Sequence, residues 1–184
     1  MRRLIAVSTV IALVLVGASL ASAATVKIVV EGEDYFSIKP SMAKATGSTQ
    51  AAGGAYIHIP LRRPHATTET GPADDGNARF KINVPVAGTY TLWARANWYD
   101  SCGNSFFVIV DNTPATVIGE DGTYGTWHWV KGARITLTAG QHVIRFQNRE
   151  DGAKLDQFLL TNNSRYVPVR AETRTPQHII RPTQ

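Results

Sequence analysis

The sequence predicts an all-β domain, an antiparallel β-sandwich, over the chain that follows its first 23 residues. Nearly every periodic segment alternates apolar and polar residues with period two, as in "ARFKINVP" and "TYTLWARAN". Turn residues such as Asp121-Gly122 and Ala139-Gly140 separate these runs. No window after residue 23 has the apolar spacing of an amphipathic helix. Short strands at regular spacing, with turns between them, are typical of a sandwich or barrel.

The expected strands follow one another closely along the chain. Phe80, Ile82 and Val84 share one face of the first clear strand, and Arg79 and Lys81 share the other. Further strands are expected at "NSFFVIVD", "ARITLT" and "HVIRFQN", and the last begins at Leu155.

The first residues, "MRRLIAVSTVIALVLVGASLASA", have the three parts of a secretory signal: two arginines, an apolar run and a small-residue site. We therefore expect a signal peptide at 1–23, cleaved between Ala23 and Ala24. The alternative is an uncleaved membrane anchor. No other segment is long and apolar enough to span a bilayer, so the sequence predicts a secreted extracellular or periplasmic protein.

The formal charge of +5 belongs to the ends of the chain. Arg2 and Arg3 lie in the predicted signal, and residues 165–184 hold four arginines and one glutamate. Residues 24–164 are therefore neutral, which argues against a nucleic-acid-binding domain. Residues 169–184, rich in proline and without periodicity, are expected to form a flexible basic tail. The tail is either a frayed end or a docking segment for a partner.

Several kinds of chemistry find no support in the sequence. Cys102 is the only cysteine, so an intramolecular disulfide is excluded, and no two histidines have zinc-ligand spacing. The sequence lacks a nucleophile elbow and a glycine-rich phosphate loop, and we therefore expect no catalytic residues. Spacing alone leaves open a glycosidase acid–base pair of Glu33 and Asp156.

Asp156 is the most unusual residue of the last strand. If side chains alternate, it shares a face with Phe158 and Leu160, where an uncompensated carboxylate is costly. Glu31 and Glu33, two apart near the start, point the same way as each other, and pairing of the first and last strands brings them to Asp156. A calcium ion is one solution for three converging carboxylates. Ordinary salt bridges are the other, with these candidate partners: Arg145, Arg149 and Lys154.

The order of the segments "EGEDY", "AAGGAYIHIP", "FKINVPVAGTYTLWARA", "NSFFVIVDN", "WHWV" and "ITLTAGQHVIRFQNREDGAKLDQFLLTN" resembles the carbohydrate-binding modules of families 6 and 35. These modules are galactose-binding-like β-sandwiches of the jelly-roll kind. The resemblance implies a single such domain over 24–168. It also implies a structural calcium site formed by Glu31, Glu33 and Asp156.

Aromatic side chains exposed in loops are the usual platforms for sugars. Trp98 in "NWYDSCGN" and Trp127 in "TYGTWHWVKG" are the candidates on this ground. The resemblance implies that Trp127 stacks on the sugar, that Lys154 hydrogen-bonds it, and that Tyr56 completes the clamp.

Two charged residues are further candidates for the rim of a sugar site. They are Arg149 and Glu150, and the planar fork of Arg149 suits an acidic sugar.

Three functions remain open at this point. The first is a secreted, non-catalytic protein that binds a polysaccharide or glycan through loop aromatics on a calcium-stabilised sandwich. The second is a structural or interaction domain of the envelope or extracellular matrix without sugar binding. Its tail would attach it to an envelope partner or to a separate carbohydrate-active enzyme. The third is a small hydrolase or lyase.

Overall fold

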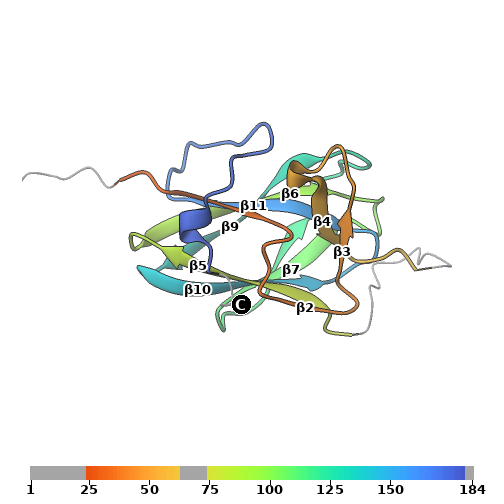
Figure 1. Cartoon of the computed structure of the whole chain (residues 1–184), viewed down its shortest axis with the longest axis horizontal. Coiled ribbons are helices and arrows are strands. Elements are labelled where there is room, and N and C mark those ends of the chain that lie inside the picture. Colours follow the sequence, from red (N-terminus) through yellow and green to blue (C-terminus); the bar gives the residue numbers. More distant parts are fainter. Residues whose placement is uncertain (1–23, 63–73, 181–184) are drawn as a thin grey trace, which may run out of the picture.

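The computed structural model describes residues 24–62 and 74–180, and it confirms a sandwich of two antiparallel sheets (Figure 1). The predicted signal peptide, 1–23, lies outside the described residues, as do 63–73 and 181–184. Within the described ranges, no helix is long and apolar enough to cross a bilayer.

One sheet has six strands and the other has five. The six-stranded sheet contains, in order, β3 (Ala43–Thr46), β4 (Ala55–His58), β11 (Lys154–Thr161), β6 (Gly88–Asn97) and β9 (His128–Leu137), with β1 (Lys27–Glu31) also paired to β11. The five-stranded sheet contains β2 (Ser37–Lys39), β5 (Asn77–Val84), β10 (Gly140–Asn148), β7 (Ser105–Val110) and β8 (Thr116–Gly119). Two short 3-10 turns complete the list: η1 (Ala52–Gly54) and η2 (Pro176–His178).

The core fills the space between the two sheets, as the period-two pattern predicts. On β5, Phe80 and Ile82 are fully buried, while Arg79 points out to solvent. Phe80 and Phe146 of the five-stranded sheet meet Phe158 of the six-stranded sheet, with ring centroids 5.0 to 6.1 Å apart. Burying each such ring stabilises the fold by about 1.5–3 kcal/mol.

Strand β11 lies in the middle of the six-stranded sheet and contains a β-bulge at Asp156. Leu155 lies opposite Ala96 of β6 and Gln157 lies opposite Arg95, so Asp156 is the extra residue between them. The strict alternation expected for this strand is therefore wrong at this point. Leu155 and Phe158 both face the core, and the bulge turns Asp156 to the outer face of the sheet, where it contacts Arg95.

The C-terminal segment differs from the flexible tail that the sequence suggested, at least as far as residue 180. It crosses the outer face of the six-stranded sheet and then descends to β5 (Figure 1). Thr175 exchanges hydrogen bonds with the backbone of Val29, and the amide of Ile180 donates to the carbonyl of Lys81 at 2.8 Å. Hydrogen bonds to backbone groups do not require apolar residues at regular spacing, so the sequence pattern could not reveal this docking.

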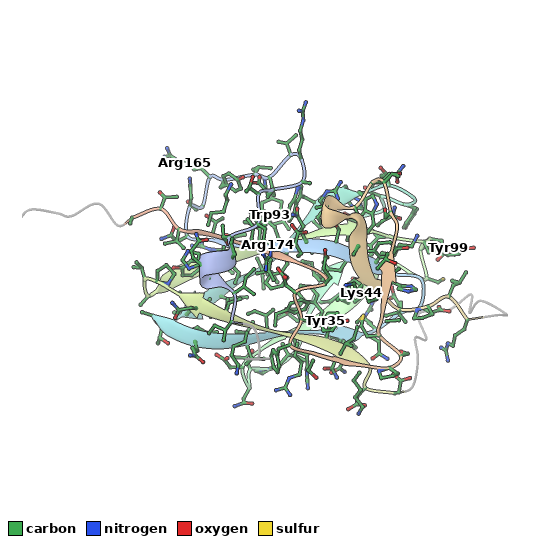
Figure 2. The ribbon with its side chains drawn as sticks, in the orientation of Figure 1. Tyr35, Lys44, Trp93, Tyr99, Arg165 and Arg174 are labelled. Atoms are coloured by element: carbon green, nitrogen blue, oxygen red, sulfur yellow. The ribbon has the colours of Figure 1, made fainter. Side chains whose placement is uncertain are left out.

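The same segment covers a small second hydrophobic cluster on that outer face. Val29, Trp93 and Leu159 form it, with Trp129 and Tyr166 packed alongside. The indole N–H of Trp129 donates to the carbonyl of Arg170 at 2.8 Å. Figure 2 shows Trp93 between the sheet and the segment above it.

Replacing Thr175 with valine should lower the free energy of unfolding by about 1–2 kcal/mol, because the amide of Val29 loses its acceptor in a buried strand. Thr173→Val is the matched control, since Thr173 is exposed in the same segment. Urea denaturation of the two variants checks this. Equal stabilities would mean that the segment adds nothing to the fold at Thr175.

Candidate functional site

A cluster of acidic residues lies where β1, β11 and η1 meet. Glu31 ends β1 opposite Gln157, and Glu33 follows in the turn after the strand. The backbone of Ala52 in η1 approaches the carboxylate of Asp156. The predicted pairing of the first and last strands is thus confirmed, and it brings all three carboxylates to one side of the sheet.

Gly32, between the two glutamates, allows this approach. Its amide donates to the carbonyl of Asp156 at 2.6 Å. A β-carbon at this position would lie 2.5 Å from the carbonyl oxygen of Leu155, which no side chain tolerates without a backbone shift. The glycine therefore lets the turn after β1 contact the bulge of β11 directly.

Two of the three residues are buried, Glu33 is half-buried, and all three carboxylates are only partly paired. Asp156 is fully buried and Glu31 is 8% exposed. One oxygen of each is buried without a hydrogen-bond partner among the described residues: Glu31 Oε2, Glu33 Oε2 and Asp156 Oδ1. Such atoms are rare in folded proteins, and a bound ion is one explanation for them.

Burial also shifts the protonation of these groups. Loss of solvent raises the pKa of Glu31 to about 7, although the Gln157 amide opposes the change and the charges of Glu33 and Asp156 add to it. Loss of solvent raises the pKa of Asp156 to about 6, against the opposing effect of the Arg95 guanidinium. Burial raises the pKa of Glu33 as well.

The positive charges around this cluster do not balance it. Arg95 pairs with Asp156, and Arg174 of the C-terminal segment donates to Asp34 at 2.9 Å. The charge of Lys44 on β3 (labelled in Figure 2) opposes the rise in the pKa of Glu33. Three cations therefore face four carboxylates, which are Glu31, Glu33, Asp34 and Asp156. The predicted salt-bridge partners of the cluster were wrong, because Arg149 pairs with Glu120 and Glu150 instead.

The side chains do not form a ready-made metal site in this structure. In the described part of the chain, no three His, Cys, Asp or Glu side chains converge closely enough to hold a metal. The donor atoms nevertheless fit a hard cation such as calcium. They are buried carboxylate oxygens without hydrogen bonds among the described residues, and calcium takes oxygen ligands of this kind.

An aromatic pair lies beside this cluster. The ring of Tyr56 on β4 meets that of Trp127 edge to face, with centroids 5.4 Å apart. Both rings are half-buried. A hollow of about 370 Å³ opens here, lined by Gln50, Arg95, Gly125, Thr126 and Trp127.

Arg95 connects the hollow to the acidic cluster. Its guanidinium lies 5.5 Å from the centre of the Trp127 ring and also contacts the carboxylate of Asp156. Two of its nitrogens lie 3.4 Å from the carbonyl oxygen of Gln50. The position of Trp127 therefore depends on the same arginine that partly neutralises Asp156.

Lys154 reaches this region through His58. Lys154 lies opposite His58 in the register of β11 and β4, and the ring of His58 packs against that of Tyr56 at 5.7 Å. Burial, with the charge of Lys154 adding to it, lowers the pKa of His58. Of the predicted ligand-binding residues, Tyr56 and Trp127 are therefore in contact, and Lys154 is connected to them only through His58.

Trp98 does not belong to an exposed loop as expected. It is fully buried, with its ring 5.7 Å from that of Phe106. Leu92, Ala94 and Ala96 face the core at alternate positions of β6, and Trp98 continues this series past the end of the strand. It closes one end of the core and cannot stack on a sugar.

Glu150 likewise differs from the predicted rim group. Its carboxylate is fully buried and accepts from the amide of Asn104 at 2.8 Å and the hydroxyl of Ser105 at 2.9 Å. Arg149 pairs with it and lies over Phe107, on the five-stranded sheet. The structure thus places Arg149 with that sheet and not with the Tyr56–Trp127 pair.

Sequence reasoning missed Gln50 and Arg95, which line the hollow, and His58, which packs against Tyr56. Alternation along β6 placed Arg95 on the outer face, and this was the only signal available. Gln50 contributes through its backbone carbonyl, which no side-chain pattern reveals.

No protein-family model matches the chain. Among curated proteins, the uncharacterized protein P23 of Formosa agariphila is 28% identical, over an alignment that covers 49% of this chain and 26% of that protein. The chain thus spans about a quarter of the length of that relative.

The solved structures are more informative. A family 35 carbohydrate-binding module from Clostridium thermocellum is 21% identical with a TM-score of 0.53, covering 75% of this chain and 98% of that one. The module CBM6cm-2 of Cellvibrio mixtus lichenase 5A, solved with cellotriose, is 18% identical with a TM-score of 0.54, covering 73% and 96%. The GH26-CBM35 β-(1,4)-mannanase of Podospora anserina is 16% identical with a TM-score of 0.58. The match covers 82% of this chain and 29% of that one.

The fold is therefore that of the carbohydrate-binding modules of families 35 and 6, and the resemblance inferred from the sequence is confirmed at this level. Identities this low extend the likeness to the fold alone. The antiparallel sandwich of the prediction is confirmed with it.

The free energy of unfolding of the metal-free protein should fall as the pH rises from 4.5, the ordinary pKa of Glu31, to about 7, its raised value. In this window folded Glu31 keeps a proton that the unfolded chain releases, so folding is favoured at the lower pH. Glu31→Gln, which cannot ionise, should flatten the slope. Denaturation in chelator across the window measures it, and an unchanged slope in the variant would rule out Glu31 as the titrating group.

Proposed function

We propose that the chain is an exported, non-catalytic protein that binds a polysaccharide through the hollow beside Trp127. The observation that carries the proposal is the Tyr56–Trp127 pair at the edge of the 370 Å³ hollow. Aromatic faces bind the C–H patches of sugars, and a few polar groups read the hydroxyls. Export rests on the signal-like residues 1–23.

Each group of the hollow has a part in this mechanism. The exposed part of Trp127 receives the sugar ring, and Tyr56 supports it from the side. Arg95 packs against the indole ring of Trp127 and, as part of the lining of the hollow, offers guanidinium hydrogens to sugar hydroxyl groups. Lys154, the register partner of His58, would contact a longer ligand that extends past Tyr56.

Calcium held by Glu31, Glu33 and Asp156 is part of the proposal. Each of these carboxylates has one buried oxygen without a hydrogen bond, and together they carry more negative charge than the neighbouring cations offset. A bound divalent ion would join the end of β1 to the bulge of β11. Because it binds only the folded chain, it would also stabilise the domain.

A hydrolase is less well supported than a binding protein. The residues described around the hollow include no carboxylate, since its lining is Gln50, Arg95, Gly125, Thr126 and Trp127. Asp156 is fully buried in an ion pair with Arg95, where it has no access to a glycosidic bond. Spacing left open an acid–base pair of Glu33 and Asp156, but the described lining of the hollow offers a bound sugar no contact with these two carboxylates.

The second candidate is a structural or interaction domain attached to a partner through its tail. The observation against it is that residues 172–180 already bind strands of their own domain. These residues are therefore engaged within the domain and are not free to attach it to an envelope component or a separate carbohydrate-active enzyme.

Trp127→Ala should weaken polysaccharide binding by a factor of about 30 or more, the usual cost of removing a central aromatic contact of about 2 kcal/mol. Affinity electrophoresis in calcium, against mannan, galactan and cellulose-derived polymers among others, measures the change. Tyr124→Ala is the control, because Tyr124 is an exposed aromatic of the same loop without a ring contact to Tyr56 or Trp127. Unchanged binding by the Trp127 variant would refute this site.

Calcium should raise the unfolding free energy by about 2.7 kcal/mol at a concentration 100 times its dissociation constant, and excess chelator should remove the gain. Glu33→Gln should lose most of this response, since its free carboxylate oxygen becomes an amide group. Asp75→Asn should keep it, because Asp75 is an exposed partner of Lys39 near the other sheet. Thermal unfolding with and without chelator gives the result, and identical curves for the parent protein would contradict a calcium site.

A further inference from the structure

The outer face of the five-stranded sheet holds two arginines in direct opposition. Arg79 of β5 and Arg145 of β10 are partners in the antiparallel register. Both point away from the core, since their neighbours Phe80 and Phe146 are fully buried in it. Like charges directly opposite each other destabilise a sheet, so the fold itself does not explain the pair.

Nothing described in the protein neutralises these two charges. No ion pair formed within 24–62 and 74–180 includes Arg79 or Arg145. The guanidinium of Arg79 stacks on Phe36 at 5.5 Å, and the ammonium of Lys81 lies 5.3 Å from the same ring, which adds a third cation. The Nε of Arg145 is buried without a hydrogen-bond partner among the described residues, which is costly unless a ligand supplies an acceptor.

The two arginines open into a hollow of about 240 Å³. Its apolar lining is the half-buried Val143 together with Ile109, which lies opposite Arg145 on β7 and is only 8% exposed. A polar rim follows β7, formed by Asp111, Asn112 and Thr113.

The one carboxylate of the rim is engaged elsewhere. Oδ1 of Asp111 accepts from the amide of Val143, and its Oδ2 lies 2.8 Å from Nδ1 of His142. Asp111 therefore leaves the guanidinium groups of Arg79 and Arg145 to other acceptors. The hollow combines two unpaired cations, an apolar patch and hydroxyl-binding groups.

We propose that this hollow binds an anionic group of a polysaccharide, a uronate carboxylate or a sulfate ester, between Arg79 and Arg145. Paired arginine forks match the oxygens of such groups, and the apolar patch suits the C–H face of the sugar that carries them. The inference rests on the proposed carbohydrate-binding function. It adds a second site, on the opposite sheet from Trp127, and it assigns acidic glycans as the substrate class.

The test compares charged polymers with uncharged polymers of the same backbone. Polygalacturonate is paired with its fully methyl-esterified form, and dextran sulfate is paired with dextran. The full chain in calcium should bind at least one charged polymer at physiological salt, and about tenfold more weakly after Arg79→Gln or Arg145→Gln. Arg134→Gln is the matched control, since Arg134 is an exposed arginine of β9 on the other sheet and loses the same charge.

A carboxylate ligand predicts that polygalacturonate responds to the substitutions, and a sulfate ligand predicts that dextran sulfate responds. Both arginine variants should fold as stably as the parent protein or more so, because each relieves a like-charge contact. Equal weakening by Arg134→Gln would show general attraction by charge and overturn the site. Absence of binding to either charged polymer would overturn it too.

The Trp127→Ala variant separates this inference from the proposed function. If it loses binding to uncharged polymers while binding to acidic ones depends on Arg145, both sites are supported. Loss of acidic binding only through Trp127 would overturn the second site and keep the first. If the parent protein binds no polymer of either kind, both proposals fail.

Discussion

The bulge at Asp156 is the feature on which the rest of the six-stranded sheet depends. On one edge β11 pairs with β4 before this residue and with β1 after it, while β6 runs along the other edge. A regular strand would direct the carboxylate into the core, among phenylalanine rings, where it would be strongly destabilising. The extra residue turns it outward instead and lets Gly32 bond to its carbonyl. One local irregularity thus permits the change of partner and creates the acidic cluster.

The cluster and the Trp127 hollow are physically joined, since Arg95 contacts both. Without an ion, Arg95 is the main positive group at Asp156, and burial still raises the pKa of Asp156 to about 6 against the effect of this arginine. A calcium ion would take over part of the neutralisation and would hold η1, whose neighbour Gln50 lines the hollow. Under the proposed function, the ion stabilises the fold and also sets the shape of the sugar site. The coupling passes through side chains in direct contact, which makes a long-range mechanism unnecessary.

Period-two alternation was sufficient to predict the sandwich, because residues such as Phe80 and Ile82 must share a face if the core is to close. The prediction for Trp98 was wrong: its polar neighbours suggested an exposed loop, but the side chain continues the core-facing series Leu92, Ala94, Ala96 and is fully buried. The bulge could not be predicted, since one extra residue leaves no mark in composition. Nor could the docking of the C-terminal segment, which is held by hydrogen bonds to backbone groups and by the ion pairs Lys27–Glu172 and Asp34–Arg174. Sequence patterns record which side chains are buried, and these features depend on backbone geometry.

As far as residue 180, the C-terminal segment packs on the outer face of the six-stranded sheet but contacts only one strand of the five-stranded sheet, so the two outer faces differ. On the six-stranded sheet it covers Trp93 and accepts the indole hydrogen of Trp129, so two tryptophans that resemble a sugar platform serve packing instead. On the five-stranded sheet the described part of the segment reaches only β5, where Ile179 bridges to Ile82, and Arg79 of that strand stays exposed beside the half-buried Arg145. The tail thus buries an aromatic face of one sheet, while the opposed arginines of the other sheet keep their charge without an ion pair among the described residues. Under the proposed second site, an acidic glycan binds on this arginine-bearing face.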